Sequence, residues 1–190
     1  MVLLAYFGRI FLNLSNKFSG NTKNHVIALY FILVHCLYYF EYLNLKILTY
    51  CFYTLVFVHK ERQILLGLKK RGFGVNKWNG FGGKLEPNEF VLDAAVRELK
   101  EECSLTVNRT DLKNIGHLEF TFEGEPLMMD VRVFTTDAFE GTPEESDEML
   151  PKWFPRDKIP FKDMWLDDKY WFPYMLQNKL FYGNIPHYIG

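Results

Sequence analysis

The sequence has few cysteines, almost no net charge and no internal repeat or low-complexity tract. Its three cysteines form no CxxC pair, so neither a zinc site nor a disulfide framework is indicated and a reducing compartment is expected. The formal net charge is −1, which gives no electrostatic reason to expect binding to a nucleic-acid polymer. Hydrophobic residues make up 48% and aromatics 17% of the 190 residues, so the chain can build a packed core.

The N-terminal part also lacks a long apolar run. Its longest, Val26 to Phe40, has 15 residues, whereas a membrane span needs about 20, and Glu41, Asn44 and Lys46 interrupt its continuation. Three interpretations stay open: an unconserved or mis-predicted extension, a mitochondrial targeting segment, and a membrane anchor over residues 26–52. We divide the chain into a hydrophobic N-terminal extension of unknown function, 1–51, and a domain, 52–190.

The domain alternates strand-like and helical segments. Residues 53–58 and 64–68 are β-branched and apolar and predict a hairpin, and a basic glycine-rich loop follows over 69–84. Further strands are predicted at 117–122 and 128–135, and a last helix over 170–179 with Pro173 in its first turn. The pattern indicates an α+β or α/β sandwich of helices around a mixed sheet.

A helix is predicted after Pro87, with Asn88 as its N-cap. Its buried stripe at helical spacing consists of Leu92, Ala95, Val96, Leu99 and Cys103. Glu98, Glu101 and Glu102 share a face beside this stripe, where like charges repel by a few tenths of a kcal/mol per pair. Such a face indicates a hard counter-ion, Mg²⁺ or Mn²⁺. A solvated acidic helix face is the alternative.

The segment from Gly83 to Leu105 resembles the Nudix box. That pattern is a glycine, five residues, a glutamate, seven residues, Arg-Glu, an aliphatic residue, any residue, Glu-Glu, any residue, glycine and an aliphatic residue. The chain departs at the last glycine, where it has Ser104. Because the family glycine serves as a left-handed C-cap, we expect serine to cost about 1 kcal/mol without touching the metal ligands.

The resemblance extends from about Tyr53 to Tyr182, through segments such as Lys69–Gly74, Trp78–Lys84 and Ile159–Asp168. Over this length the chain is similar to the animal MutT-type oxidised purine nucleoside triphosphate hydrolases (8-oxo-dGTPases) of the Nudix family. Their C-termini carry a further strand where this sequence stops at Gly190, so the expected domain has a shortened C-terminus and an uncertain sheet edge.

The resemblance implies metal-dependent hydrolysis of modified purine nucleoside triphosphates, such as 8-oxo-dGTP and 2-hydroxy-dATP, to the monophosphate and pyrophosphate. Such a reaction sanitises the nucleotide pool and prevents DNA damage. It further implies a cytoplasmic monomer, with a mitochondrial or nuclear fraction, whose partner is a small nucleotide. Two alternatives stay open: a Nudix hydrolase for another nucleoside diphosphate derivative, and a catalytically weak Nudix-fold module.

The resemblance also assigns site residues. The Gly82 carbonyl and four glutamates would hold the metal, and one of Glu101, Glu102 and Glu148 would act as general base, with a Glu89–Arg97 salt bridge holding the geometry. The implied catalytic residues are Glu98, Glu101, Glu102 and Glu148. The implied substrate-binding residues are Thr54, Lys69, Phe73, Asn79, Phe81, Gly82, Gly83, Lys84, Phe120, Met129, Trp165, Leu166, Asp167 and Asp168.

Base recognition would depend on three polar side chains. Asn79 can offer a donor and an acceptor to a purine edge. Asp167 and Asp168 are adjacent in an apolar context, where two acids do not both ionise easily, so one should hold a proton near neutral pH. We hypothesise that moving this proton lets one pocket accept both 8-oxo-dGTP and 2-hydroxy-dATP.

Overall fold

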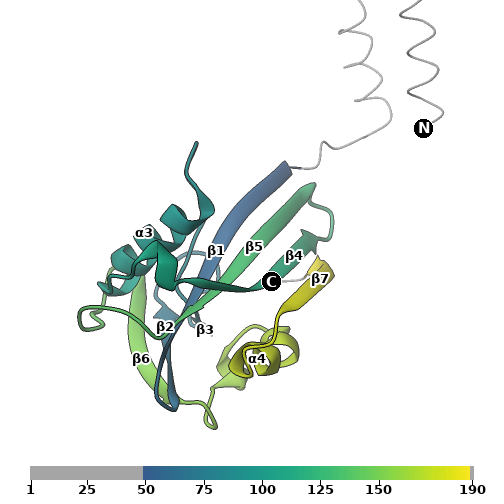
Figure 1. Cartoon of the computed structure of the whole chain (residues 1–190). Helices are drawn as coiled ribbons and strands as arrows, with labels where there is room; N and C mark the ends of the chain where they lie inside the picture. The colour runs from purple at the N-terminus through teal and green to yellow at the C-terminus, as the bar shows by residue number, and fades with distance from the viewer. Residues whose placement is uncertain (1–48, 189–190) are drawn as a thin grey trace, which may run out of the picture. The chain divides into compact units, whose positions relative to one another are not determined.

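The computed structural model describes residues 49–188, with side chains up to residue 186 (Figure 1). The apolar run at 26–40 lies outside this part, so its three interpretations stay predictions. No helix among the described residues is long and apolar enough to span a membrane. The first strand begins at Thr49, so residue 52, where we start the domain, lies inside a strand.

A seven-stranded mixed sheet forms the centre of the domain (Figure 1). β1 pairs with β2 in the predicted antiparallel hairpin and with β5 in parallel, from Thr49 opposite Leu127 to Val58 opposite Thr136. The order is β3-β2-β1-β5-β4-β7, and β6 pairs with β2. The strands are β1 (Thr49–Lys60), β2 (Gln63–Lys69), β3 (Trp78–Asn79), β4 (Lys113–Phe122), β5 (Leu127–Thr136), β6 (Met149–Pro155) and β7 (Phe181–Tyr188). The predicted mixed sheet with helices is confirmed.

Helix α3 (Val91–Cys103) carries the box glutamates and packs on one face of the sheet. Ala95, Leu99 and Cys103 of the predicted stripe are buried, and Leu92 and Val96 are half-buried against the same core. The prediction of Asn88 as N-cap is wrong. Asn88 has φ +65° in a tight turn, Phe90 takes the N-cap position, and no side chain of the described segment caps it.

Helix α4 (Asp168–Leu176) packs on the opposite face, where it contacts Phe57 of β1. It begins two residues before the predicted start at Tyr170, so Pro173 lies inside the helix and not in its first turn. Two short 3-10 turns, η1 (Arg109–Asp111) and η2 (Phe161–Asp163), complete the elements. β7 was not predicted, because Gly183 and Pro186 disfavour a strand except at a sheet edge.

Candidate functional site

Glu102 is a buried box glutamate that projects from α3 toward the glycine-rich loop. The Gly82 N–H donates to Glu102 Oε2 at 2.8 Å. The Lys69 ammonium donates to Glu102 Oε1 at 3.0 Å and to Glu148 Oε2 at 2.9 Å. A lysine at the end of β2 therefore joins the helix to the loop before β6, and brings together acids that are 46 residues apart in sequence.

Arg97, in the middle of α3, forms the predicted salt bridge to Glu89 in the loop before the helix. Its Nε and second terminal nitrogen donate to the two oxygens of Glu89 at 2.8 and 2.9 Å. These bonds lower the pKa of Glu89 to about 2. The other terminal nitrogen donates to Glu98 at 2.8 Å and to Glu101 at 3.1 Å, so one guanidinium orients two of the expected metal ligands.

Negative charge is concentrated at this end of the site. Burial raises the pKa of Glu102 to about 7, against the opposing charge of Lys69, and burial also raises the pKa of Glu98. A cavity of about 550 Å³ collects the four expected acids with cationic and glycine neighbours. It is lined by Lys69, Arg71, Gly82, Gly83, Lys84, Glu98, Glu101, Glu102, Ser146, Asp147 and Glu148.

These residues fit a divalent cation. The donors are carboxylate oxygens, which hard cations prefer. The buried Glu102 carboxylate is costly to ionise without a cation beside it. A side chain at Gly83 would place its Cβ 2.4 Å from Glu98 Oε1. Any residue other than glycine would therefore displace this carboxylate. We call this acidic cavity the metal-ligand cavity.

A second cavity, of about 470 Å³, adjoins the first and shares Lys69, Arg71, Gly82, Gly83 and Glu148 with it. Aromatic and apolar side chains dominate its walls, and we call it the aromatic pocket. The expected residues that line it are Thr54, Lys69, Phe73, Asn79, Gly82, Gly83, Phe120, Met129, Trp165, Asp167 and Asp168. One ligand could therefore place a polyanionic group in the metal-ligand cavity and an aromatic group in the aromatic pocket.

Two aspartates line the aromatic pocket beside the start of α4. Asp168 Oδ2 accepts a hydrogen bond from the Trp165 N–H at 3.0 Å, and Asp167 Oδ2 accepts one from Trp171 Nε1 at 3.0 Å. Burial and then the charge of Asp167 raise the pKa of Asp168 to about 8. Asp168 is therefore the member of the pair that holds the proton at neutral pH.

Two buried polar atoms on the pocket wall have no hydrogen-bond partner within residues 49–188: Asp167 Oδ1 and Thr54 Oγ1. Because leaving such atoms unpaired costs about 1–3 kcal/mol each, they favour a ligand that carries polar groups. The Asn79 side chain, on the same wall, accepts a hydrogen bond from Gly80 N–H at 2.8 Å. The pocket thus combines apolar walls with a few polar atoms, as small-molecule sites do.

A pair of stacked rings forms another part of the aromatic pocket. Phe73 packs on Trp165 with centroids 4.9 Å apart and planes 24° apart, and Lys77 Nζ lies 5.0 Å from the same indole. Gly72 and Gly74 beside Phe73 both have positive φ, 74° and 83°. Phe73 is 62% exposed, so the loop presents a large aromatic face to solvent at this position.

Three expected substrate-binding residues do not line the aromatic pocket. Phe81 is fully buried in the core beneath α3, because it points to the opposite side of the chain from Gly82. Leu166 is 76% exposed, and Lys84 lines only the metal-ligand cavity. The sequence interpretation missed Trp171 and Lys77; the four-residue spacing from Asp167 to Trp171 could have indicated the former.

The comparisons with known proteins agree with this geometry. The family model described as NUDIX domain matches residues 51–175. The chain is 53% identical over 132 residues to the oxidized purine nucleoside triphosphate hydrolase of Mus musculus, covering 70% of this chain and 83% of the relative. It is 56% identical over 130 residues to the protein of that name from Danio rerio, covering 68% and 82%.

A solved structure gives the same result for the fold. The MutT protein from Bacillus halodurans superposes with a TM-score of 0.64 at 27% identity, over 72% of this chain and 89% of that one. Nudix hydrolases use a divalent metal, which agrees with the clustered carboxylates of α3. The family model, the two relatives and the fold lead to one conclusion: the chain belongs to the Nudix hydrolase family.

Proposed function

We propose that this enzyme hydrolyses oxidised purine nucleoside triphosphates to the monophosphate and pyrophosphate, and so removes damaged precursors from the nucleotide pool. The observation that carries the proposal is the junction of the two cavities, where Lys69 and Glu148 line both. A triphosphate would occupy the metal-ligand cavity while its base enters the aromatic pocket. The names of the mouse and zebrafish relatives support the same substrate class.

The base would be recognised by the aspartate pair. A protonated Asp168 donates a hydrogen bond, and Asp167 Oδ1, which has no partner in the described part of the chain, accepts one. Purines oxidised at position 8 or at position 2 differ in which ring atoms donate and accept. Transfer of the single proton between the two carboxyls would reverse the donor and the acceptor, so the pocket could serve both bases.

Catalysis would take place at the metal-ligand cavity. The residues that would hold the ion are Glu98, Glu101, Glu102, Glu148 and the Gly82 carbonyl. We propose Mg²⁺, with Mn²⁺ as a substitute; the ion supplies charge neutralisation for the phosphates and lowers the pKa of attacking water. Lys69 would move from its carboxylate partners to a phosphate oxygen. One of Glu101, Glu102 and Glu148 would accept the proton of the water.

The decisive experiment is pyrophosphate release from 8-oxo-dGTP and 2-hydroxy-dATP with Mg²⁺, for the wild type and Glu102→Gln. We expect the substitution to lower the rate by at least about 100-fold, since it removes an anionic ligand or base. Undamaged dGTP and a nucleoside diphosphate sugar serve as comparison substrates. Equal rates for the two proteins would mean that the metal site is misassigned, and no turnover of any modified triphosphate would favour a catalytically weak module.

The enzyme would act as a cytoplasmic monomer, with mitochondrial or nuclear fractions as the alternatives, and residues 1–51 would be an extension to the catalytic domain. Fractionation of the full chain and of a chain that begins at Thr49 tests the compartment and the role of the extension, because a targeting or anchoring role requires that only the full chain be retained on membranes or in mitochondria.

A further inference from the structure

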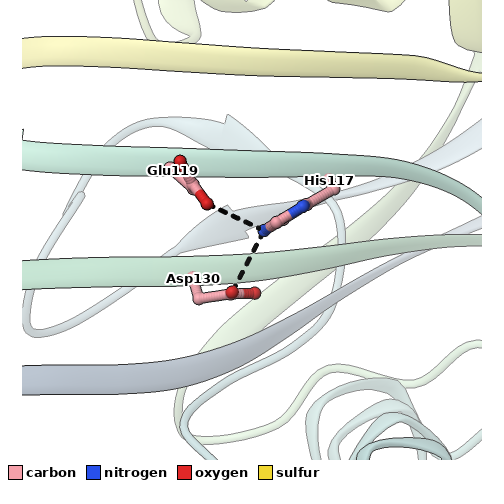
Figure 2. A group of neighbouring side chains, drawn as sticks. All are labelled: His117, Glu119 and Asp130. Atoms are coloured by element: carbon pink, nitrogen blue, oxygen red, sulfur yellow. Dashed lines mark ion pairs between the residues drawn. The ribbon is translucent and has the colours of Figure 1, made fainter.

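A group of metal-ligating side chains lies away from the two cavities, on strands β4 and β5 (Figure 2). It consists of His117, Glu119 and Asp130. Leu118 and Phe120, which alternate with the first two, line the aromatic pocket. Because successive side chains of a strand point to opposite faces, the group lies on the other face of the sheet. It shares no residue with the metal-ligand cavity.

The three ligand atoms converge. His117 Nε2 lies 3.0 Å from Asp130 Oδ2 and 3.6 Å from Glu119 Oε1, and all three atoms lie within 4.8 Å of one another (Figure 2). The side chains are 23%, 22% and 11% exposed for the histidine, the glutamate and the aspartate. Ligand bonds of about 2.1 Å in a tetrahedral site separate the donors by about 3.4 Å, which lies between the two distances to Nε2.

The imidazole nitrogen is buried, yet makes no hydrogen bond to any described residue in spite of these short distances. A nitrogen that donates a hydrogen bond points at the acceptor. A nitrogen and an oxygen that share an ion both point at the ion, so in a tetrahedral site the nitrogen axis lies about 35° from the line to the oxygen. Short contacts without a hydrogen bond fit the second arrangement.

Neighbouring side chains donate hydrogen bonds to both carboxylates, at Glu119 Oε2 and at both oxygens of Asp130. Tyr182 Oη donates to Glu119 Oε2 at 2.5 Å and Asn184 Nδ2 donates to the same oxygen at 3.2 Å. Arg132 Nε donates to Asp130 Oδ1 at 2.9 Å, and its terminal nitrogen reaches Oδ2 at 3.3 Å. The Tyr182 ring also packs edge-on against the imidazole at 5.3 Å. In metal sites, the ligands are typically oriented by hydrogen bonds from surrounding residues that do not themselves bind the ion.

We propose that His117, Glu119 and Asp130 form a second metal site, which binds a divalent transition-metal ion such as Zn²⁺. One imidazole and two carboxylates suit Zn²⁺, whereas Mg²⁺ prefers oxygen ligands alone. The spacing of the cysteines gave no indication of zinc because none of the three ligands of this site is a cysteine. An ion here would join β4 to β5 directly and, through Tyr182 and Asn184, would fix β7 at the edge of the sheet.

The test is a titration with Co²⁺, a spectroscopic substitute for Zn²⁺, in the presence of excess Mg²⁺ to occupy the metal-ligand cavity. The wild type should bind one Co²⁺ with the visible absorption of a nitrogen-containing, low-coordinate site. His117→Gln should weaken this binding by at least about 100-fold, and Tyr182→Phe by about tenfold. Glu123→Gln, which removes an exposed carboxylate just after β4, is the matched control and should bind as the wild type does.

The Co²⁺ titration does not depend on the proposed function. Pyrophosphate release should be unchanged in His117→Gln. Near-UV circular dichroism of each variant reports whether it folds; if His117→Gln does not, Glu119→Gln and Tyr182→Phe decide the question. Equal Co²⁺ affinity in the wild type and the folded ligand variants, or no Co²⁺ binding by the wild type, overturns the proposal.

Discussion

The substitution Asp168→Asn should stabilise the protein in a pH-dependent manner. Asparagine has the size of aspartate and its side-chain oxygen can still accept the hydrogen bond from the Trp165 N–H. What it removes is a carboxyl that is 2% exposed and lies next to a second acid. The change therefore isolates the cost of ionising this group in the folded state.

The expected size follows from the pKa, which burial and the charge of Asp167 raise from 3.8 to about 8. Below the ordinary value both states of the wild type bind the proton. Between the two values the unfolded chain releases it and the folded chain keeps it, so the stability of the wild type falls as pH rises. The full shift corresponds to about 6 kcal/mol as an upper limit. Because buried sites behave as if their effective dielectric constant were about 20 and not that of a dry interior, we expect about 2–3 kcal/mol.

Urea unfolding at a series of pH values between about 5 and 9 measures this difference. The free energy of unfolding of Asp168→Asn minus that of the wild type should grow with pH and level off above about 8. Asp167→Asn is the control. It removes the neighbouring charge, so the pKa of Asp168 falls and the stability of this variant depends less on pH than that of the wild type. A difference that is constant over this range, or an asparagine variant less stable throughout, would refute the assignment of the proton to Asp168.

Three further substitutions test other parts of the site. Gly83→Ala should lower the rate of pyrophosphate release by about 10- to 100-fold with a normal circular dichroism spectrum, because its Cβ would lie 2.4 Å from Glu98 Oε1 and displace that ligand. Phe73→Ala should raise KM for 8-oxo-dGTP by about tenfold and change kcat little, since it removes an aromatic contact; an unchanged KM would contradict a role in base binding. Ser104→Gly should raise Tm by about 2–4 °C in thermal unfolding, because the residue has φ 65°, and a lower Tm would show that no strain is stored there.

The sequence predicted the structure best where the chemistry of the site fixes the spacing of residues along the chain. The Nudix box predicted the helix, the Arg97–Glu89 salt bridge and the left-handed C-cap at Ser104. Each of these features depends on residues that are close together in the sequence. It could not show that Lys69 joins Glu102 to Glu148, since that contact depends on the pairing of β2 with β6.

Errors arose where several local signals competed. Asn88 is a good N-cap residue, but it occupies a left-handed turn that asparagine also tolerates, and the helix starts three residues later. Phe81 lies between glycines of the binding loop, and only the structure shows that its ring faces the core. The group around His117 was not seen because its members come from two strands whose register the sequence does not reveal.

The parallel pairing of β1 with β5 has a consequence for how the chain reaches this fold. Residues that become hydrogen-bonded neighbours, such as Thr49 and Leu127, are 78 positions apart, so a long loop must close before the middle of the sheet exists. Folding should accordingly be slow, on the order of milliseconds to seconds. During synthesis the β1–β2 hairpin leaves the ribosome well before β5, and until β5 arrives its open edge can pair with another nascent chain.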